Sequence, residues 1–125
     1  VMEHMENPYH FLREVHRVLK NDHYFIMSVP SIFHIFSRLI FLKAGLFPRW
    51  NHRNNHISLF PRGVIDKIAS RYFITEQVLY TKPSFRLNKF TRFSTYAPAN
   101  EWFGNYVVYV MKRKPFSPFT VNNSK

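Results

Sequence analysis

Apolar residues recur with a helical period in the first part of the chain. They stand three and four residues apart, the spacing that gathers side chains on one face of a helix, at Phe11, Leu12, Val15, Val18 and Leu19. Asn7 is a favourable N-cap and Pro8 suits the first helical position. The pattern therefore predicts a helix over residues 7–20.

The following segment, residues 24–29, is an almost unbroken apolar run. Such runs are typical of central strands in parallel sheets, where helices cover both faces. Asn21-Asp22 predicts a turn before this strand, and Pro30 ends it. A helix followed by a buried strand is the second half of a β-α-β unit. We therefore expect Val1-Met2 to be the end of a preceding strand, parallel to residues 24–29, and the chain to be cut at its N-terminus.

The rest of the chain predicts further alternation of helices and strands. An apolar helix over residues 31–47 is expected to stop at Gly45, and a basic loop follows up to His56. A short helix over residues 61–70 and strands over 72–81 and 105–111 complete the α/β pattern, with an irregular aromatic segment at 82–103. We expect one domain over residues 1–114 and a disordered tail over 115–125.

Composition narrows the classes of function. Hydrophobic residues make up 46% of the 125, which indicates a folded chain, and the lack of cysteine excludes disulfides, thiolate metal sites and a cysteine nucleophile. The net charge of +11 favours anionic partners. No signal peptide or membrane-spanning stretch is evident, so a cytoplasmic protein is expected.

Several motifs, taken in order, resemble class I S-adenosylmethionine-dependent methyltransferases. Val1-Met2-Glu3-His4 is similar to a strand ending in "V-x-E-H", and Arg17-Val18-Leu19-Lys20 to a helix ending in "R-V-L-K". Residues 25–30 are similar to a strand ending in "S-V-P", and residues 56–60 precede a short helix as in the family. The sequence departs from the family at Asn21-Asp22-His23, where "P-G-G" is usual, at Arg71-Tyr72-Phe73, where "A-G-F" is usual, and at Ser31, where Asn is common.

The resemblance implies the C-terminal half of a Rossmann-like seven-stranded sheet. The chain would hold the end of strand four and strands five to seven, with the last strand antiparallel between the fifth and sixth. The strands that carry the glycine-rich cofactor loop and the ribose-binding acid would be missing, and no Gly-x-Gly-x-x-Gly occurs here. The expected function is that of a methyltransferase fragment, inactive alone, whose parent uses S-adenosylmethionine on a small-molecule or glycan acceptor. The alternative is a basic module that contacts nucleic acid or an anionic membrane surface.

Three residues are candidates for the site. Glu3 and His4 would follow strand four at the ligand-binding edge and border the cofactor pocket, although His4 could equally cap or pack on the next helix. His56 is a candidate base or substrate-positioning residue, with a backbone-bonded loop histidine as the alternative. His52 and His56 stand four apart, but a loop with Pro48 and without an intervening Glu predicts no metal site.

Two apolar segments have alternative interpretations. The helix at residues 32–42 could wall or cover the substrate pocket, lie on an anionic membrane, or simply pack on the sheet. Aromatic residues are expected in the core or the pocket wall, with base stacking as the alternative because basic residues stand among them: Trp50, Phe85, Phe90, Phe93 and Trp102, with Arg86, Lys89 and Arg92.

Overall fold

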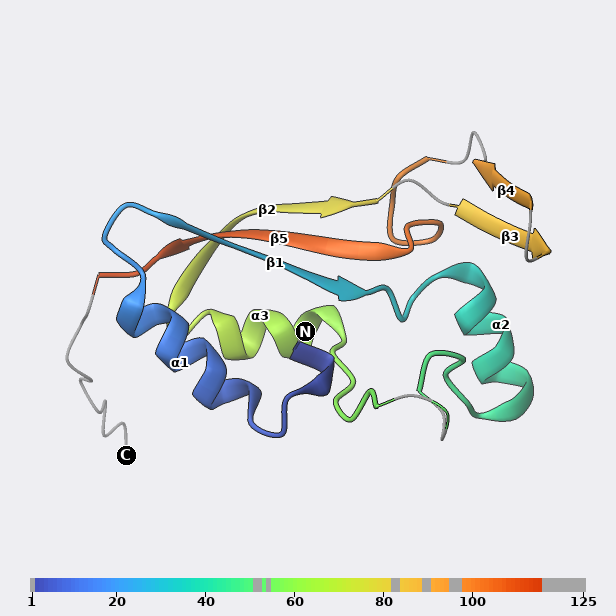
Figure 1. Ribbon diagram of the computed structural model, residues 1–125, viewed down its shortest axis with the longest axis horizontal. Helices are drawn as coiled ribbons and strands as arrows, with labels where there is room; N and C mark the ends of the chain where they lie inside the picture. Colours follow the sequence, from blue (N-terminus) through green and yellow to red (C-terminus); the bar gives the residue numbers. More distant parts are fainter. Residues whose placement is uncertain are drawn as a thin grey trace, which may run out of the picture.

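The protein has a mixed α/β fold, in which helices pack against a three-stranded sheet (Figure 1). The computed structural model describes residues 2–50, 53, 55–81, 84–88, 91–94 and 98–115. The elements are the 3-10 helix η1 (Met2–His4), the helices α1 (Pro8–Val18), α2 (Ile35–Ala44) and α3 (Arg62–Ala69), and the strands β1 (Tyr24–Pro30), β2 (Phe73–Tyr80), β3 (Ser84–Asn88), β4 (Thr91–Ser94) and β5 (Tyr106–Arg113). The α/β class predicted from the sequence is confirmed.

The three predicted α-helices are present, and local chemistry sets their ends. The Asn7 side chain accepts a hydrogen bond from the His10 N–H at 2.9 Å, so it caps α1 as expected. α2 begins at Ile35, after the cap residue His34, which is later than the pattern suggested. It stops at Gly45, whose φ of 66° lies in the left-handed region that glycine adopts without strain.

The strand from the C-terminal part of the chain occupies the centre of the sheet. The strand order is β1-β5-β2, and β5 pairs antiparallel with both neighbours. This confirms the prediction that the last strand inserts antiparallel between the two earlier ones. β1 and β2 consequently run in the same direction, and both end where β5 begins.

The expected partner of β1 at the N-terminus is not a strand. Met2–His4 form a 3-10 turn, and β1 lies at an edge of the described sheet, so its predicted central position beside a parallel stub is wrong. The physical reason is that the polar backbone groups of residues 2–5 form hydrogen bonds within their own turn and with the loop at residues 57–58, not with β1. The Met5 N–H donates to the Met2 carbonyl at 3.0 Å, and the Glu3 carbonyl accepts from the N–H groups of Ile57 and Ser58. Val1 lies outside the described residues.

The turn before β1 is anchored to the far end of β5. Asp22 adopts a φ of 63°, the left-handed conformation that Asp and Asn tolerate better than most residues. Its carboxylate lies 3.1 Å from the Lys112 ammonium, and Arg113 donates to the Asn21 side chain at 2.9 Å. Asn21-Asp22 thus makes the turn predicted there without the glycines usual in the family.

Only one face of the sheet is covered. α1 and α3 lie on that face in Figure 1, where they bury a core that includes Leu12, Met27, Val29, Ile65, Ile68, Phe73, Tyr109 and Met111. In the described part of the chain no helix covers the other face. Its exposed apolar side chains include Tyr24, Ile26, Ile74, Leu79 and Tyr106. The expectation that β1 is covered on both faces is therefore wrong for this chain.

Part of the segment expected to be irregular forms a hairpin. β3 and β4 pair antiparallel as a separate two-stranded sheet, which corrects the prediction for residues 82–103. Polar and apolar residues alternate along Ser84–Asn88, the two-residue period of a strand, and this signal was outweighed by the aromatic content of the segment. The tail predicted to be disordered lies, apart from Pro115, outside the described residues.

No helix within the described ranges is long and apolar enough to cross a membrane.

The one-sided cover predicts that two isoleucines differ sharply in their contribution to stability. Ile65 on α3 is completely buried, whereas Ile26 on β1 is 64% exposed. Ile65→Ala should lower the free energy of unfolding by about 2–5 kcal/mol, because it leaves a cavity in the core. Ile26→Ala should cost about 1 kcal/mol or less. Denaturant titration of both variants checks this, and equal losses would show that the outer face is packed.

Candidate functional site

The loops at the carboxyl ends of β1 and β2 converge on the start of β5. The Ser31 N–H donates to the Asn105 carbonyl at 2.9 Å, and the Thr81 N–H donates to the Tyr106 carbonyl at 3.0 Å. The Arg49 guanidinium also donates to the Asn105 carbonyl at 2.9 Å, which ties the basic loop to this edge. Ligands of open α/β sheets bind at the carboxyl edge of the strands, so this edge is the candidate location of a site.

The three residues selected from the sequence come together in space. One possible ligand atom from each of Glu3, His4 and His56 lies within 4.8 Å of the other two. The imidazole rings of His4 and His56 meet edge to face with centroids 4.7 Å apart, and the Glu3 Oε1 lies 3.9 Å from the His4 Nε2. Glu3 is buried, His56 is half-buried and His4 is exposed, so this Glu3–His4–His56 cluster is open to solvent on one side.

Backbone contacts hold the loop of His56 against η1. Besides the two hydrogen bonds to the Glu3 carbonyl, the Ser58 hydroxyl donates to the Met5 carbonyl at 3.3 Å. The Trp50 indole N–H donates to the Ser58 carbonyl at 3.0 Å, and its ring lies 5.4 Å from that of His56. The cluster is thus built on two fixed turns rather than on one mobile loop.

Carbonyl groups fix the orientation of both imidazoles. The His4 Nδ1 lies 3.0 Å from the Asn55 carbonyl oxygen, and the His56 Nδ1 lies 2.7 Å from that of Arg49. Because a carbonyl oxygen only accepts hydrogen bonds, each Nδ1 carries a proton, and in the neutral ring Nε2 is then the basic nitrogen. His56 therefore has the backbone bond of a structural loop histidine and also a defined base.

The Glu3 carboxyl is held in its charged form. Burial raises the pKa of Glu3. The hydrogen bond and positive charge of the N-terminal ammonium, a hydrogen bond from the Glu3 backbone N–H and, least, the charge of protonated His4 together outweigh burial, so the pKa is lowered. A carboxylate beside two imidazoles can accept a proton, orient a hydroxyl group or bind a cation.

A second polar group lies nearby at the end of β1. His34 caps α2 by accepting a hydrogen bond from the Phe36 N–H at 3.3 Å, and its side chain is buried. Burial lowers the pKa of His34, and the positive charge of Arg49 lowers it further. The lowered pKa favours the neutral form of His34, which no local sequence pattern predicts.

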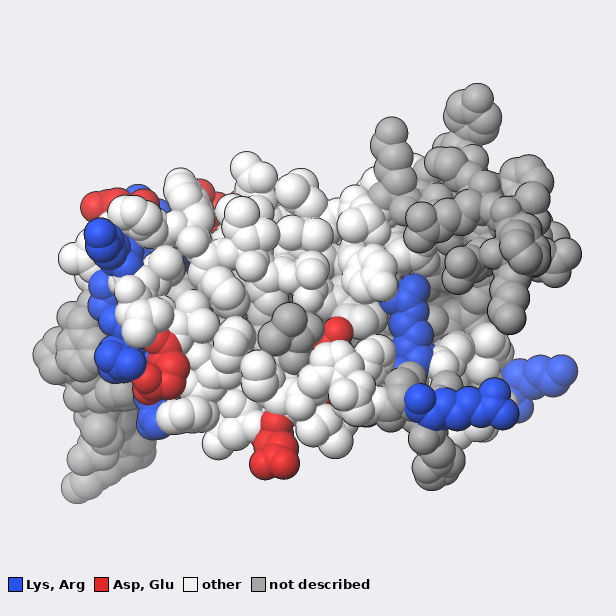
Figure 2. Space-filling model, in the orientation of Figure 1, with Lys and Arg blue, Asp and Glu red and all other residues white. Residues whose placement is uncertain are grey.

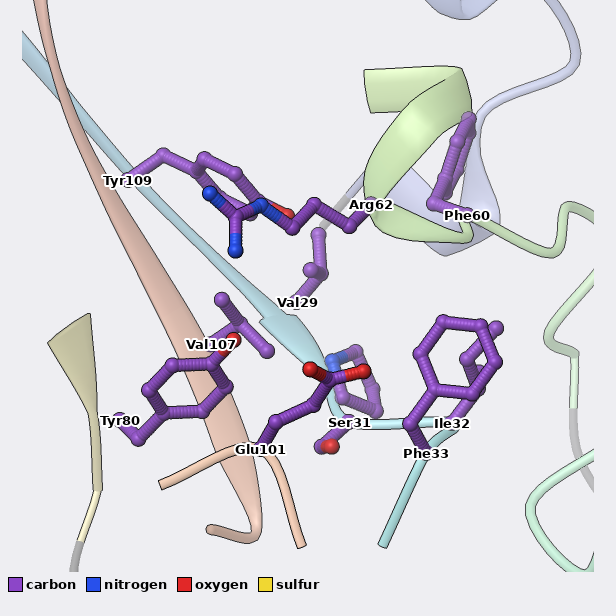
Figure 3. Close-up of a pocket in the computed structure, with 11 residues that line it drawn as sticks. Val29, Ser31, Ile32, Phe33, Phe60, Arg62, Tyr80, Glu101, Val107 and Tyr109 are labelled. Atoms are coloured by element: carbon purple, nitrogen blue, oxygen red, sulfur yellow. The ribbon is translucent and has the colours of Figure 1, made fainter. Parts of the chain in front are cut away.

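A small hollow opens beside these groups on the covered face of the sheet (Figure 3). Glu101 points into it, with Ser31, Tyr80, Arg62 and Tyr109 around it. Burial, with a smaller contribution from Asp66 and Tyr80, raises the pKa of Tyr109 to about 12, so its hydroxyl remains protonated at neutral pH. The cavity volume is about 10 Å³, room for about one water molecule, so it cannot hold a larger ligand in this conformation.

The sequence missed the contacts between α2 and Glu101, one of the residues that line this hollow. The Arg38 guanidinium on α2 stacks 3.9 Å from the centre of the Trp102 ring and pairs with the Glu101 carboxylate at 3.3 Å. A cation between an aromatic face and a carboxylate is a stabilising arrangement in a partly buried position. No local pattern pointed toward this contact, because Arg38 and Glu101 stand 63 residues apart in the sequence.

The other sequence candidates are dispersed or fall outside the description. Trp50 contacts His56 and Trp102 contacts Arg38, so neither forms a stacking surface with the other. His52 and Phe90 lie outside the described residues, as do the side chains from Phe85 to Phe93. The expectation that His52 and His56 form no metal site therefore remains a prediction, and base stacking remains the untested alternative.

The chain matches no protein-family model, and comparisons with curated proteins and with solved structures found no match either.

The buried position of His34 predicts a pH-dependent stability. In the unfolded chain an ordinary histidine has a pKa of about 6.5, above the lowered value in the fold. The unfolded state therefore binds more protons in the window below about pH 6.5, and stability falls as the pH drops through it. His34→Gln should flatten this part of the curve. Urea titrations from about pH 7 to 5, with His23→Gln as the exposed control, measure it, and parallel curves for all three proteins would contradict it.

Proposed function

We propose that this chain is the C-terminal half of a class I S-adenosylmethionine-dependent methyltransferase domain. Its parent would transfer a methyl group to a small-molecule or glycan acceptor, and the chain alone would be inactive. The order β1-β5-β2, with the last strand antiparallel to both neighbours, carries the proposal. It is the arrangement that the resemblance requires of strands five, seven and six, and hairpin-connected strands would give a different order.

The unpaired outer edge of β1 and the uncovered face of the sheet support the same proposal. Among the described residues, β1 has no strand partner on its outer edge. An apolar groove lies along that edge, lined by Met2, Phe11, Phe25, Ile26, Met27 and Ser28. The opposite face of the sheet also exposes apolar side chains. The remaining strands and helices of a doubly wound domain would cover both surfaces.

None of the three glycines of this chain lies in a glycine-rich, cofactor-binding loop. Gly45 ends α2 in the left-handed conformation, and Gly63 lies within α3. Gly104 approaches β2 so closely that a Cβ atom would stand 2.9 Å from the Tyr80 Cβ. None belongs to a phosphate- or methionine-binding loop, so the cofactor would be bound chiefly by residues outside these 125.

The Glu3–His4–His56 cluster would supply the acceptor side of the reaction. The cofactor provides an electrophilic methyl group, and the protein must align the acceptor and, where needed, remove its proton. The His56 Nε2 is the candidate base, since the Arg49 carbonyl fixes the proton on Nδ1. Glu3 and His4 would border the pocket.

The proposal predicts that the 125-residue chain and the protein extended at its N-terminus differ in their affinity for S-adenosylmethionine. The 125-residue chain alone should bind no S-adenosylmethionine at micromolar concentration, because it lacks the glycine loop and the ribose-binding acid. The protein extended by the residues encoded upstream should bind it with micromolar affinity. Isothermal titration calorimetry on both proteins checks this. Micromolar binding by the 125 residues, or none by the extended protein, would contradict the proposal.

The same proposal predicts that the isolated 125-residue chain aggregates or unfolds without a sharp transition. Each large apolar side chain left exposed forgoes roughly 1.5–3 kcal/mol, and whole domains are stable by only about 5–15 kcal/mol. An apolar strand edge also promotes aggregation. We expect aggregation or a broad thermal transition from these 125 residues, and rescue by the upstream segment. Size-exclusion chromatography and circular dichroism measure this, and a sharply melting soluble monomer would argue against a half-domain.

α2 favours a second candidate function, contact with an anionic membrane surface. It exposes a run of apolar side chains, namely Phe36, Leu39, Ile40, Phe41 and Leu42, and basic Lys43 follows them. Lys and Arg side chains gather toward the two ends of the side seen in Figure 2, one of them near α2. The coding sequence upstream of Val1 distinguishes the candidates. A strand followed by a glycine-rich loop favours the methyltransferase, and an unrelated domain favours the membrane-binding module.

A further inference from the structure

We propose that the Glu3–His4–His56 cluster binds one divalent transition-metal ion, for which Zn²⁺ is the best match. The proposal goes beyond methyl transfer and does not depend on it. One carboxylate and two imidazoles are the donor set of many three-ligand zinc sites, which keep a further position for water or a substrate oxygen.

The distances suit such an ion after small side-chain rotations. Ligand atoms about 2.1 Å from a tetrahedral ion lie about 3.4 Å from one another. The Glu3 Oε1 and the His4 Nε2 are 3.9 Å apart, and one carboxylate oxygen and one ring nitrogen from each histidine lie within 4.8 Å of one another. Closing the cluster therefore needs movements of about 1 Å, which side-chain rotation can provide while the backbone stays in place.

The surroundings of the cluster resemble the outer shell of a metal site. Histidine ligands generally donate their second ring N–H to a carbonyl or carboxylate, which fixes the tautomer and raises the basicity of the ligand nitrogen. Both histidines have such a contact, through the carbonyls of Asn55 and Arg49. In this arrangement Nε2 of each ring is the ligand atom.

The donor types select the class of ion. Mg²⁺ and Ca²⁺ prefer shells made entirely of oxygen, whereas imidazole suits zinc and its neighbours. The chain has no cysteine, so a closed thiolate site is excluded and the ion would keep an open position. The exposed side of His4 places that position toward solvent.

The sequence expectation of no metal site considered only one pair of histidines. It compared His56 with His52, four residues away in the loop. The fold instead places His56 beside Glu3 and His4 of η1, because the N–H groups of Ile57 and Ser58 donate hydrogen bonds to the Glu3 carbonyl. Sequence spacing could not show this group of ligands.

Zinc titration of the chelator-treated protein tests the proposal, with the whole encoded chain used, including any residues upstream of Val1. Calorimetry should show one Zn²⁺ per chain with a micromolar or smaller Kd. His56→Ala and Glu3→Gln should each weaken binding at least about tenfold, because each removes a ligand. His23→Ala is the matched control, since His23 is exposed and bonds to its own turn through the Asn21 carbonyl. Its affinity should be unchanged.

X-ray absorption spectroscopy of the zinc-loaded native protein needs no variant and covers the case in which a variant does not fold. The expected shell contains two imidazoles and a carboxylate. A shell without imidazole, no binding at micromolar zinc, or full affinity in a folded His56→Ala protein would overturn the proposal. Because none of these measurements uses S-adenosylmethionine, failure here leaves the methyltransferase proposal standing, and the reverse also holds.

Discussion

The fold depends on the antiparallel pairing of β5 with two strands that arrive from different parts of the chain. β5 takes its hydrogen bonds from β1 on one side and β2 on the other, and it carries the completely buried Met111 and the nearly buried Tyr109. Without β5, β1 and β2 would not be neighbours. The pairing also aligns the ends of β1 and β2, so that the loops after them meet at one edge.

That pairing explains why apolar side chains lie on both faces of the sheet, although helices cover only one face within the described residues. The antiparallel register places Met27, Val29, Tyr109 and Phe73 on the face that α1 and α3 cover. It places the intervening apolar residues on a face that no helix covers within the described segments. Large exposed apolar surfaces mark places where other protein or membrane packs. The exposed apolar face of the described sheet is thus the physical observation on which the half-domain proposal depends most.

The candidate site illustrates how function arises at the junctions of such a fold. Glu3 and His4 come from the turn before α1, and His56 from the loop before α3. The backbone hydrogen bonds between Glu3 and residues 57–58 place them together. Oriented imidazoles beside a charged carboxylate can serve as base or as metal ligands. The first use is the one that the methyl-transfer proposal needs, and the second is the metal proposal. At His56 the two uses exclude each other, because the Nε2 lone pair cannot accept a proton while it binds an ion.

Local patterns were sufficient for the three α-helices and for the strands β1, β2 and β5, but not for the hairpin of β3 and β4. Helical periodicity with Asn7 and Gly45 set α1 and the end of α2, and the apolar run set β1, because these signals act within a few residues. Long-range pairing decided the rest. The turn at Met2–His4, the edge position of β1 and the Arg38–Glu101 contact depend on groups far apart in sequence, whose hydrogen bonds no local pattern encodes. The sequence therefore determined most of the local elements and supplied candidate residues, and the tertiary structure decided which of these residues meet.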